Sequence, residues 1–190
     1  MNYQIVCAGI GGRGVLLAST ILMETAIRTG YHALASDEYG MSQRGGSVVS
    51  LVKIGDFRSP LIGAESADIL LAFEESEFYR NLHFLKVGGL AVINTDKKTL
   101  PAAIMELLRN RETAVYLIDA DSLAKKLDMI QASNMAVLGF FSRLGIGPYT
   151  TENIQKTIEK RVPGKVRDRN LGVFREGCAR GESLTEHRVV

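Results

Sequence analysis

The sequence predicts an α/β protein with three layers, α/β/α, in which a largely parallel sheet carries an added antiparallel hairpin. Short apolar runs alternate with amphipathic segments of helical spacing, and a glycine-rich turn joins the first run to the first helical segment. With 46% hydrophobic and 23% charged residues, the 190-residue chain can bury a core without disulfides. We therefore expect one domain over residues 1–180 and a loose polar tail over residues 181–190.

The first elements predict a βαβ unit. Residues 3–8 form an apolar run that stops at Gly9, which is typical of a strand buried on both faces. Apolar residues then recur at helical spacing until Gly30, whose freedom to adopt positive φ suits a helix end. Residues 31–35 follow as a second strand, which we expect to run parallel to the first with a right-handed crossover.

The added hairpin is predicted from residues 47–62. A β-branched run over residues 47–54 is followed by Gly55 and Asp56, which favour a turn, and then by a second run over residues 57–62. Pro60 has no N–H to donate, so the second strand should be short or lie at an edge of the sheet.

The α/β alternation then resumes to the end of the domain. Asp121, Asn134 and either Thr150 or Thr151 are placed to cap helices. The segment 135–144 is apolar on nearly all sides, which favours a buried helix over one that faces a partner chain. We expect strands over residues 68–73, 90–94 and 114–119, and helices over residues 76–85, 101–110, 121–128, 134–145, 151–161 and 169–180.

Composition excludes several classes of function. A net charge of +2 is too small to indicate nucleic acid or anionic lipid as a partner. The chain has no apolar run near the roughly 18 residues of a membrane span and does not begin like a signal peptide, so we expect a cytoplasmic protein. Its two cysteines, Cys7 and Cys178, are too few for an iron–sulfur cluster, and the histidines lack metal-site spacing. We expect Cys7 to be a buried structural thiol.

The first glycine loop matches a dinucleotide-binding fingerprint, Gly9-x-Gly11-x-x-Gly14, between a strand and a helix. Gly11 and Gly12 would let the backbone approach an anion at the helix N-terminus, with Arg13 beside it. The alternative is that the glycines only let the helix pack closely against the first strand. Both interpretations remain open from this pattern.

A second loop combines charge, an aromatic ring and glycine, and we interpret it as a contact surface for a ligand or a partner chain. The Arg44 guanidinium could bind an anion or carboxylate through two hydrogen bonds. It could equally pair within the chain with Glu38 or Asp37 and so fix the loop. The candidate residues of this loop are Glu38, Tyr39, Gly40, Arg44, Gly45 and Gly46.

Three glutamates, Glu74, Glu75 and Glu77, follow the strand expected over residues 68–73. They lie where open α/β sheets bind ligands, at the carboxyl end of a strand. The simpler interpretation, which we favour, is that they stabilise a helix N-terminus.

These motifs together resemble the gamma-type subunit or domain of the 2-oxoacid:ferredoxin (acceptor) oxidoreductases, which act on pyruvate, 2-oxoglutarate, 2-ketoisovalerate or indolepyruvate. The resemblance is strong over residues 5–94 and weak beyond. The family's first loop usually reads G-x-G-G-Q-G, so Arg13 replaces a neutral amide with a permanent cation. The motifs are Gly9 to Gly14, Glu38-Tyr39-Gly40, the run from Gln43 to Val48, Ser59-Pro60, and the run from Ala67 to Glu74.

The resemblance implies a subunit that supports coenzyme A-dependent oxidative decarboxylation of a 2-oxoacid and has neither a catalytic residue nor a metal of its own. Thiamine diphosphate, Mg²⁺ and the 4Fe–4S clusters would be carried by thiamine-binding and ferredoxin-like partner subunits, with ferredoxin as the acceptor. It also associates the loop from Gly9 to Gly14 with an anion or coenzyme A. The run over residues 41–48 looks closer to indolepyruvate-type members.

The alternative function is a stand-alone dinucleotide-binding protein, either a small NAD- or flavin-dependent reductase or a regulatory module. Such an enzyme would need a cofactor site, a substrate pocket and an acid or base within one domain. Beyond the first loop, the sequence offers no convincing catalytic residue. The subunit interpretation therefore predicts that the isolated chain is inactive.

Overall fold

A computed structural model describes residues 1–39 and 45–190, apart from the side chains of Tyr39, Thr185 and Glu186. Six strands form one sheet in the order β2-β3-β1-β4-β5-β6. Strand β3 is antiparallel to both of its neighbours, whereas β1, β4, β5 and β6 are parallel in succession. The strands are β1 Tyr3–Ile10, β2 Ala33–Tyr39, β3 Ser47–Ile54, β4 Ala67–Ala72, β5 Leu85–Asn94 and β6 Ala114–Ile118.

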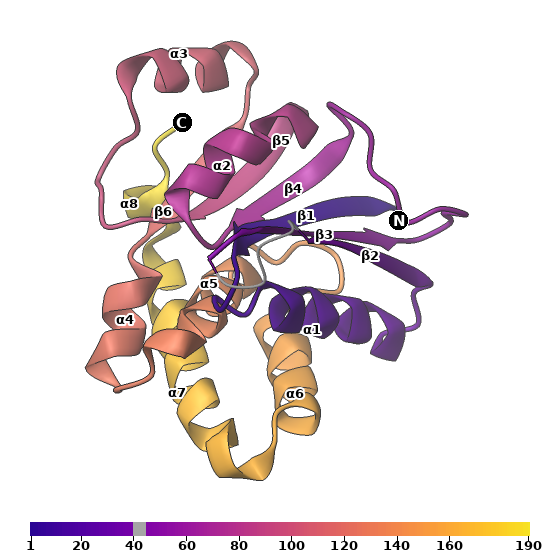
Figure 1. The fold of residues 1–190 in the computed structure, drawn as a ribbon, viewed down its shortest axis with the longest axis vertical. Coiled ribbons are helices and arrows are strands. Elements are labelled where there is room, and N and C mark those ends of the chain that lie inside the picture. The colour runs from indigo at the N-terminus through magenta and orange to yellow at the C-terminus, as the bar shows by residue number, and fades with distance from the viewer. Residues whose placement is uncertain (40–44) are drawn as a thin grey trace.

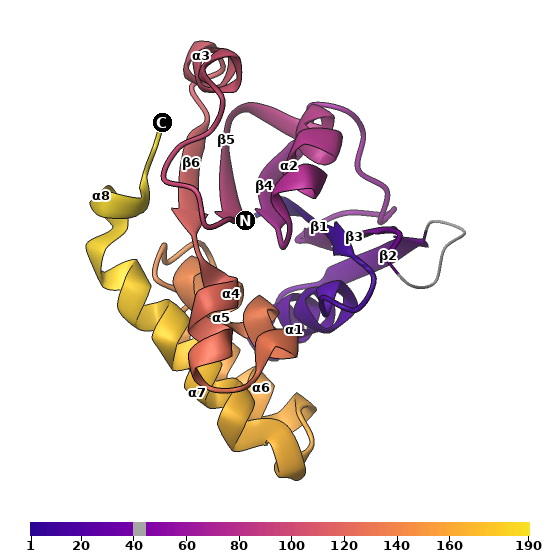
Figure 2. The ribbon, with the colours of Figure 1, turned by 60° about the vertical axis from the view of Figure 1, so that its left-hand side comes forward.

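Helices cover both faces of the sheet, which confirms the predicted α/β/α layers. Helices α2 and α3 lie on one face, and α1, α5, α6 and α7 lie on the other (Figures 1 and 2). In the described ranges, no helix is both long enough and apolar enough to cross a membrane. The helices are α1 Val15–Arg28, α2 Glu75–Asn81, α3 Ala102–Asn110, α4 Ala120–Lys126, α5 Ser133–Ser142, α6 Thr151–Arg161, α7 Gly164–Arg180 and α8 Leu184–His187.

Alternate residues of each central strand supply two separate cores, because side chains of a strand point to opposite faces. In β1, Ile5 and Cys7 belong to the core under α1 and α5, whereas Val6 and Ala8 belong to the core under α2 and α3. Burial, with a smaller contribution from the Asp37 charge, raises the pKa of the Cys7 thiol. Cys7 is therefore a neutral packing group, as the sequence predicts.

The predicted hairpin is wrong in its second strand. Strand β3 pairs with β2, from Ala33 opposite Ile54 to Tyr39 opposite Val48, and residues 55–66 form no strand. Since β3 lies between β2 and β1, its peptide groups need hydrogen-bonding partners on both sides. The segment that contains Pro60 could supply one N–H donor fewer than β2 does. β1 and β2 do run in the same direction, but β3 separates them.

Two predicted helix caps are also wrong. Helix α4 is capped by Asp119, whose Oδ1 accepts from the Ser122 N–H at 2.9 Å, rather than by Asp121. Asn134 lies inside α5, whose first turn has no side-chain cap. Both Asp121 and Asn134 instead bind other segments, as described below.

Other predictions for this region are confirmed. The Thr150 side chain caps α6 by accepting from the Asn153 N–H at 3.2 Å. Every residue of α5 is buried, as its uniformly apolar sequence predicts. Helix α7 is longer than expected, since it begins at Gly164 directly after Pro163.

The C-terminal tail is not loose. After the short helix α8, the Val189 N–H donates to the Val115 carbonyl at 2.9 Å, and Arg188 forms an antiparallel bridge with Tyr116. The tail thus lies along β6, the last strand of the sheet (Figure 2). An edge strand presents unpaired N–H and carbonyl groups, and these bonds satisfy some of them.

Helices α5 and α7 pack backbone to backbone through two glycines. A methyl group on Gly139 would lie 2.1 Å from the Phe174 carbonyl oxygen, and one on Gly177 would lie 2.0 Å from the Ala136 carbonyl oxygen. The buried helix α5 therefore tolerates no larger residue at this crossing.

We predict that Gly177→Ala lowers the free energy of unfolding by about 1–3 kcal/mol, because the added methyl group overpacks a backbone contact that cannot yield. Gly172→Ala is the matched control on the same helix, where the nearest atom to the new methyl is Leu127 Cδ1 at 3.4 Å. The control should be neutral or stabilising by up to about 1 kcal/mol. Urea denaturation followed by circular dichroism measures both, and equal destabilisation would contradict the packing argument.

Candidate functional site

The carboxyl ends of β1, β4, β5 and β6 meet at one edge of the sheet, where open α/β folds bind their ligands. Each strand is followed there by polar or flexible residues. These include the first glycine loop after β1, Glu74 after β4, Asn94 at the end of β5, and Asp119 and Asp121 after β6.

The two glycine loops predicted separately lie together. Because β3 is antiparallel to β1, Ser47 lies opposite Ile10, and the Gly11 N–H donates to the Gly46 carbonyl at 2.9 Å. Gly45 beside it is exposed and has a φ of 75°. The described end of the second loop, Gly45 and Gly46, therefore lies beside the first loop.

Part of that prediction lies outside the described residues, namely Gly40, Arg44 and the side chain of Tyr39. Glu38 is exposed on β2 opposite Val49. Its neighbour Asp37 accepts a hydrogen bond from Ser50 Oγ at 2.5 Å, which ties β2 to β3.

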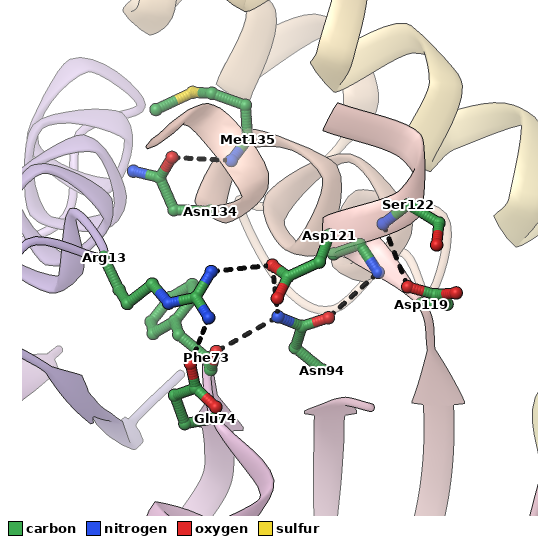
Figure 3. A network of polar contacts seen from close by, with 10 residues as sticks. Arg13, Phe73, Glu74, Asn94, Asp119, Asp121, Ser122, Asn134 and Met135 are labelled. Atoms are coloured by element: carbon green, nitrogen blue, oxygen red, sulfur yellow. Dashed lines mark hydrogen bonds and ion pairs between the residues drawn. The ribbon is translucent and has the colours of Figure 1, made fainter. Parts of the chain in front are cut away.

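Arg13 connects the first loop to two other strands. Its guanidinium lies between Glu74, at 2.5 Å, and Asp121, at 3.0 Å (Figure 3). Its side chain is 25% exposed, so water screens these ion pairs only in part. Two carboxylates already neutralise its charge, which leaves Arg13 little attraction for a further anion.

Asn94 positions one of these carboxylates. Its Nδ2 donates to Asp121 Oδ1 at 3.0 Å and to the Phe73 carbonyl at 3.1 Å. Its Oδ1 accepts from the Ala120 N–H at 2.9 Å, so the buried side chain joins the ends of β4, β5 and β6 (Figure 3). The sequence analysis missed Asn94, although a polar residue that ends an apolar strand is a signal that could have found it.

Packing accounts for two glycines of the dinucleotide fingerprint. A methyl group on Gly9 would lie 2.7 Å from Val15 Cγ2, so this glycine lets α1 approach β1. One on Gly14 would lie 2.5 Å from Asn134 Nδ2, which donates to the Gly14 carbonyl at 3.0 Å. Gly12 differs, because it has a φ of 95° and open space around it. The packing interpretation of the loop thus explains Gly9 and Gly14 without a ligand.

The charges above β4, β5 and β6 are unsuited to a phosphate. A cavity of 310 Å³ at the ends of β4, β5 and β6 is lined by five carboxylates. Phosphate oxygens would meet like charge at this position.

These carboxylates do not form a metal site. In the part of the chain that the structure describes, no three acidic, histidine or cysteine side chains are arranged to hold a metal ion. The carboxylates are those of Glu74, Glu75, Asp96, Asp119 and Asp121.

The three glutamates after β4 have different partners. Glu75 accepts from Thr95 Oγ1 at 2.6 Å, Tyr79 Oη at 2.7 Å and Lys97 Nζ at 2.8 Å. Burial acts to raise the pKa of Glu75, but these hydrogen bonds outweigh it and hold the pKa below its usual value. Glu77 is buried and accepts from Ser47 Oγ at 2.6 Å. Glu74 directly precedes α2, and Glu75 and Glu77 lie in its first turn. All three glutamates therefore have structural roles at the start of this helix.

An apolar cleft of 350 Å³ opens beside the first loop. It is bounded by backbone of the loop and by side chains of α1 and β3. An apolar cleft with backbone at its rim suits a side chain of a partner protein better than it suits a phosphate. Its lining consists of Ile10, Gly11, Gly12, Gly14, Val15, Leu16 and Val48.

Comparisons with known proteins agree over almost the whole chain. The family model for pyruvate ferredoxin/flavodoxin oxidoreductase matches residues 4–180. The chain is 32% identical to "Indolepyruvate oxidoreductase subunit IorB" of Archaeoglobus fulgidus, with 93% of this chain and 94% of the relative covered. It is 28% identical to "2-oxoglutarate synthase subunit KorC" of Methanothermobacter thermautotrophicus, with 92% of each covered.

A solved structure supports the same assignment. The gamma subunit of a keto/oxoacid ferredoxin oxidoreductase from Geobacter sulfurreducens PCA superposes with a TM-score of 0.76 and 26% identity, over 95% of this chain and 99% of that one. These relatives are subunits, so a stand-alone dinucleotide-binding protein is not favoured. The chain belongs to the pyruvate ferredoxin/flavodoxin oxidoreductase family.

Proposed function

We propose that this chain is the gamma-type subunit of a multisubunit 2-oxoacid:ferredoxin oxidoreductase and has no complete active centre of its own. The main support is the match to separate gamma-type subunits along nearly their whole length. In the proposed complex, a 2-oxoacid is oxidatively decarboxylated with coenzyme A, and ferredoxin accepts the electrons.

The cofactors of this reaction belong, in our proposal, to the partner chains. Thiamine diphosphate, Mg²⁺ and the 4Fe–4S clusters would be held by the thiamine-binding and ferredoxin-like subunits. An iron–sulfur cluster takes thiolate ligands, but Cys7 is fully buried and its pKa is raised by that burial. The chain's two cysteines are too few for such a cluster, and the burial of Cys7 further supports placing the clusters on the partner chains.

We further propose an aromatic 2-oxoacid, such as indolepyruvate, as the substrate. The indolepyruvate oxidoreductase relative is 32% identical, compared with 28% for the 2-oxoglutarate synthase relative. The sequence run over residues 41–48 favours the same subgroup. The side chain of the substrate would be bound mainly by the thiamine-bearing subunit.

The surface made by the two glycine loops is our proposed contact with that subunit. It joins Gly11 to Gly46 and borders the apolar cleft, and Leu16 lines this cleft without belonging to the core. When a partner covers an apolar side chain in an exposed cleft, the burial of apolar surface stabilises the complex. Arg13 has a supporting role in this proposal, because its ion pairs hold the first loop against β4 and α4.

We predict that the isolated chain neither oxidises 2-oxoacids nor reduces ferredoxin. Co-expression with the thiamine-binding and ferredoxin-like subunits should restore coenzyme A-dependent ferredoxin reduction, faster with indolepyruvate than with 2-oxoglutarate. Anaerobic spectrophotometry of a low-potential acceptor measures both rates. Turnover by the isolated chain would refute the subunit assignment, whereas a complex that prefers 2-oxoglutarate would refute only the substrate.

We predict that Leu16→Glu weakens assembly with the partner subunits by about 10- to 100-fold, the loss expected for an apolar contact of about 1.5–3 kcal/mol. Leu107→Glu is the matched control, since Leu107 is a 43% exposed leucine on α3, on the opposite face of the sheet. The control should assemble normally. Biolayer interferometry measures both affinities, and equal affinities for the two variants would rule out the cleft as the contact.

We predict that Arg13→Ala lowers the free energy of unfolding by about 1 kcal/mol, because it leaves Glu74 and Asp121 without their partially buried cation. Arg13→Gln should lose less, since a glutamine amide can still donate to one carboxylate. Lys156→Ala, which removes a solvent-exposed ion pair with Glu152, should have a smaller effect. Urea denaturation compares the three variants, and an Arg13→Ala effect no larger than that of Lys156→Ala would show that these pairs do not hold the loop.

A further inference from the structure

A second group of cavities lies along the carboxyl ends of β5 and β6, on the side of the acidic cavity away from the first loop. The larger has a volume of 520 Å³, and its lining includes Lys98, Arg180 and His187. A smaller cavity of 140 Å³ shares Arg180 and His187 and adds Ser122 and Lys126. We call these two adjoining cavities the basic groove.

Four separate segments bring the basic side chains of this groove together. Lys98 follows β5, Lys126 ends α4, Arg180 ends α7, and His187 ends α8. Figure 2 shows α8 and the C-terminus beside β6. Val189 of the tail lines the larger cavity. The groove is therefore a product of the tertiary fold rather than of a charged run in the sequence.

His187 is held in a defined orientation. Its Nδ1 lies 3.0 Å from the Leu117 carbonyl oxygen, and its ring packs edge to face against Phe140 at a centroid distance of 5.3 Å. A nitrogen that faces a carbonyl must carry a proton, so Nε2 is the ring nitrogen that remains for a ligand.

The basic groups differ in how far they are already neutralised. Lys97 pairs with Glu75 at 2.8 Å. Lys98, Lys126 and Arg180 make no ion pair with any side chain in the described parts of the chain. Isolated surface lysines are usually just solvated, but Lys126 and Arg180 share the smaller cavity with the fixed histidine and Ser122. Arg180 and the histidine also line the larger cavity, together with Lys98. No described carboxylate pairs with these cations, in contrast to Arg13.

The groove also contains two carboxylates, Asp96 and Asp119. Asp119 already accepts the Ser122 N–H through Oδ1, and Asp96 is exposed. Carboxylates would repel an extended polyanion such as nucleic acid, but they accept hydrogen bonds from the hydroxyl groups of a small molecule. The mixture of charges thus favours a compact ligand with one anionic end and a hydroxylated end.

We propose that the basic groove binds a phosphate ester that also carries hydroxyl groups, such as a sugar phosphate or a ribonucleotide. Arg180, Lys126 and Lys98 bind the phosphate oxygens, which suits both the planar guanidinium and the ammonium groups. Asp96 accepts from the hydroxyl groups. This assignment rests on the groove alone and does not depend on the proposed subunit function.

The test is a titration of the ¹⁵N-labelled full-length chain with ribose 5-phosphate, inorganic phosphate and ribose, followed by amide chemical shifts. Ribose 5-phosphate should produce saturable shifts that cluster at Lys98, Ser122, Arg180 and His187. Inorganic phosphate should shift the same amides with weaker affinity, and ribose alone should shift none at the same concentration.

Two double variants with the same change in charge make the test specific. Lys126→Gln with Arg180→Gln should weaken the binding of ribose 5-phosphate about tenfold or more, because each removed charge-assisted hydrogen bond contributes substantially to affinity. Lys125→Gln with Arg175→Gln changes exposed residues of the same two helices that do not line the groove, and should alter affinity less than about twofold.

Three outcomes would overturn the proposal. The first is the absence of saturable shifts with ribose 5-phosphate up to about 10 mM, a concentration that would reveal even millimolar affinity. The second is equal weakening in the two double variants, which would indicate a diffuse effect of charge. The third is clustering of the shifts at residues 11–14, which would place the phosphate in the first loop instead.

Discussion

The antiparallel direction of β3 is the constraint on which the arrangement of this site depends. Because β3 runs against β1, it begins at the edge of the sheet where β1 ends, and the segment before Ser47 must meet the segment after Ile10. The hydrogen bond from Gly11 to Gly46 follows from that geometry. A parallel strand in this position would have begun at the opposite edge, and the two glycine loops would lie a full strand length apart.

Along the edge formed by the carboxyl ends of the strands, acidic and basic side chains gather at different positions. Above β4 and β5 the carboxylates outnumber the cations, and Arg13 is already bound by two of them. Above β6, Lys98, Lys126 and Arg180 make no ion pair with other described side chains, whereas Lys97 is paired with Glu75. Because charge–charge energy falls with distance and with screening by water, the two ends of this edge attract different ligands. The apolar cleft beside β1 and β3 suits a protein contact, and the groove beside β6 suits an anion.

The sequence predicted what depends on local pattern. Strand β6 and helix α6 were predicted closely because their periodicity and the Thr150 cap are properties of neighbouring residues. The partner of β3 and the bonded tail were missed, because a strand's neighbours are chosen by the topology of the whole sheet. For the same reason, the sequence could not predict the hydrogen bond between Asn94 and Asp121. Their contact requires the ends of two strands to be adjacent.

The glycine fingerprint shows why a motif needs its contacts before it indicates a ligand. In a dinucleotide site the glycines must leave N–H groups free to face a phosphate. Here the Gly11 N–H is bonded to Gly46, and the Arg13 N–H is bonded to the Ile10 carbonyl at 3.1 Å. Gly14 is required by the close approach of Asn134, a side chain from the buried helix α5. The packing of a helix against a sheet and a second helix therefore accounts for Gly9 and Gly14 of this spacing, and the Arg13 charge, held by Glu74 and Asp121, reinforces that packing.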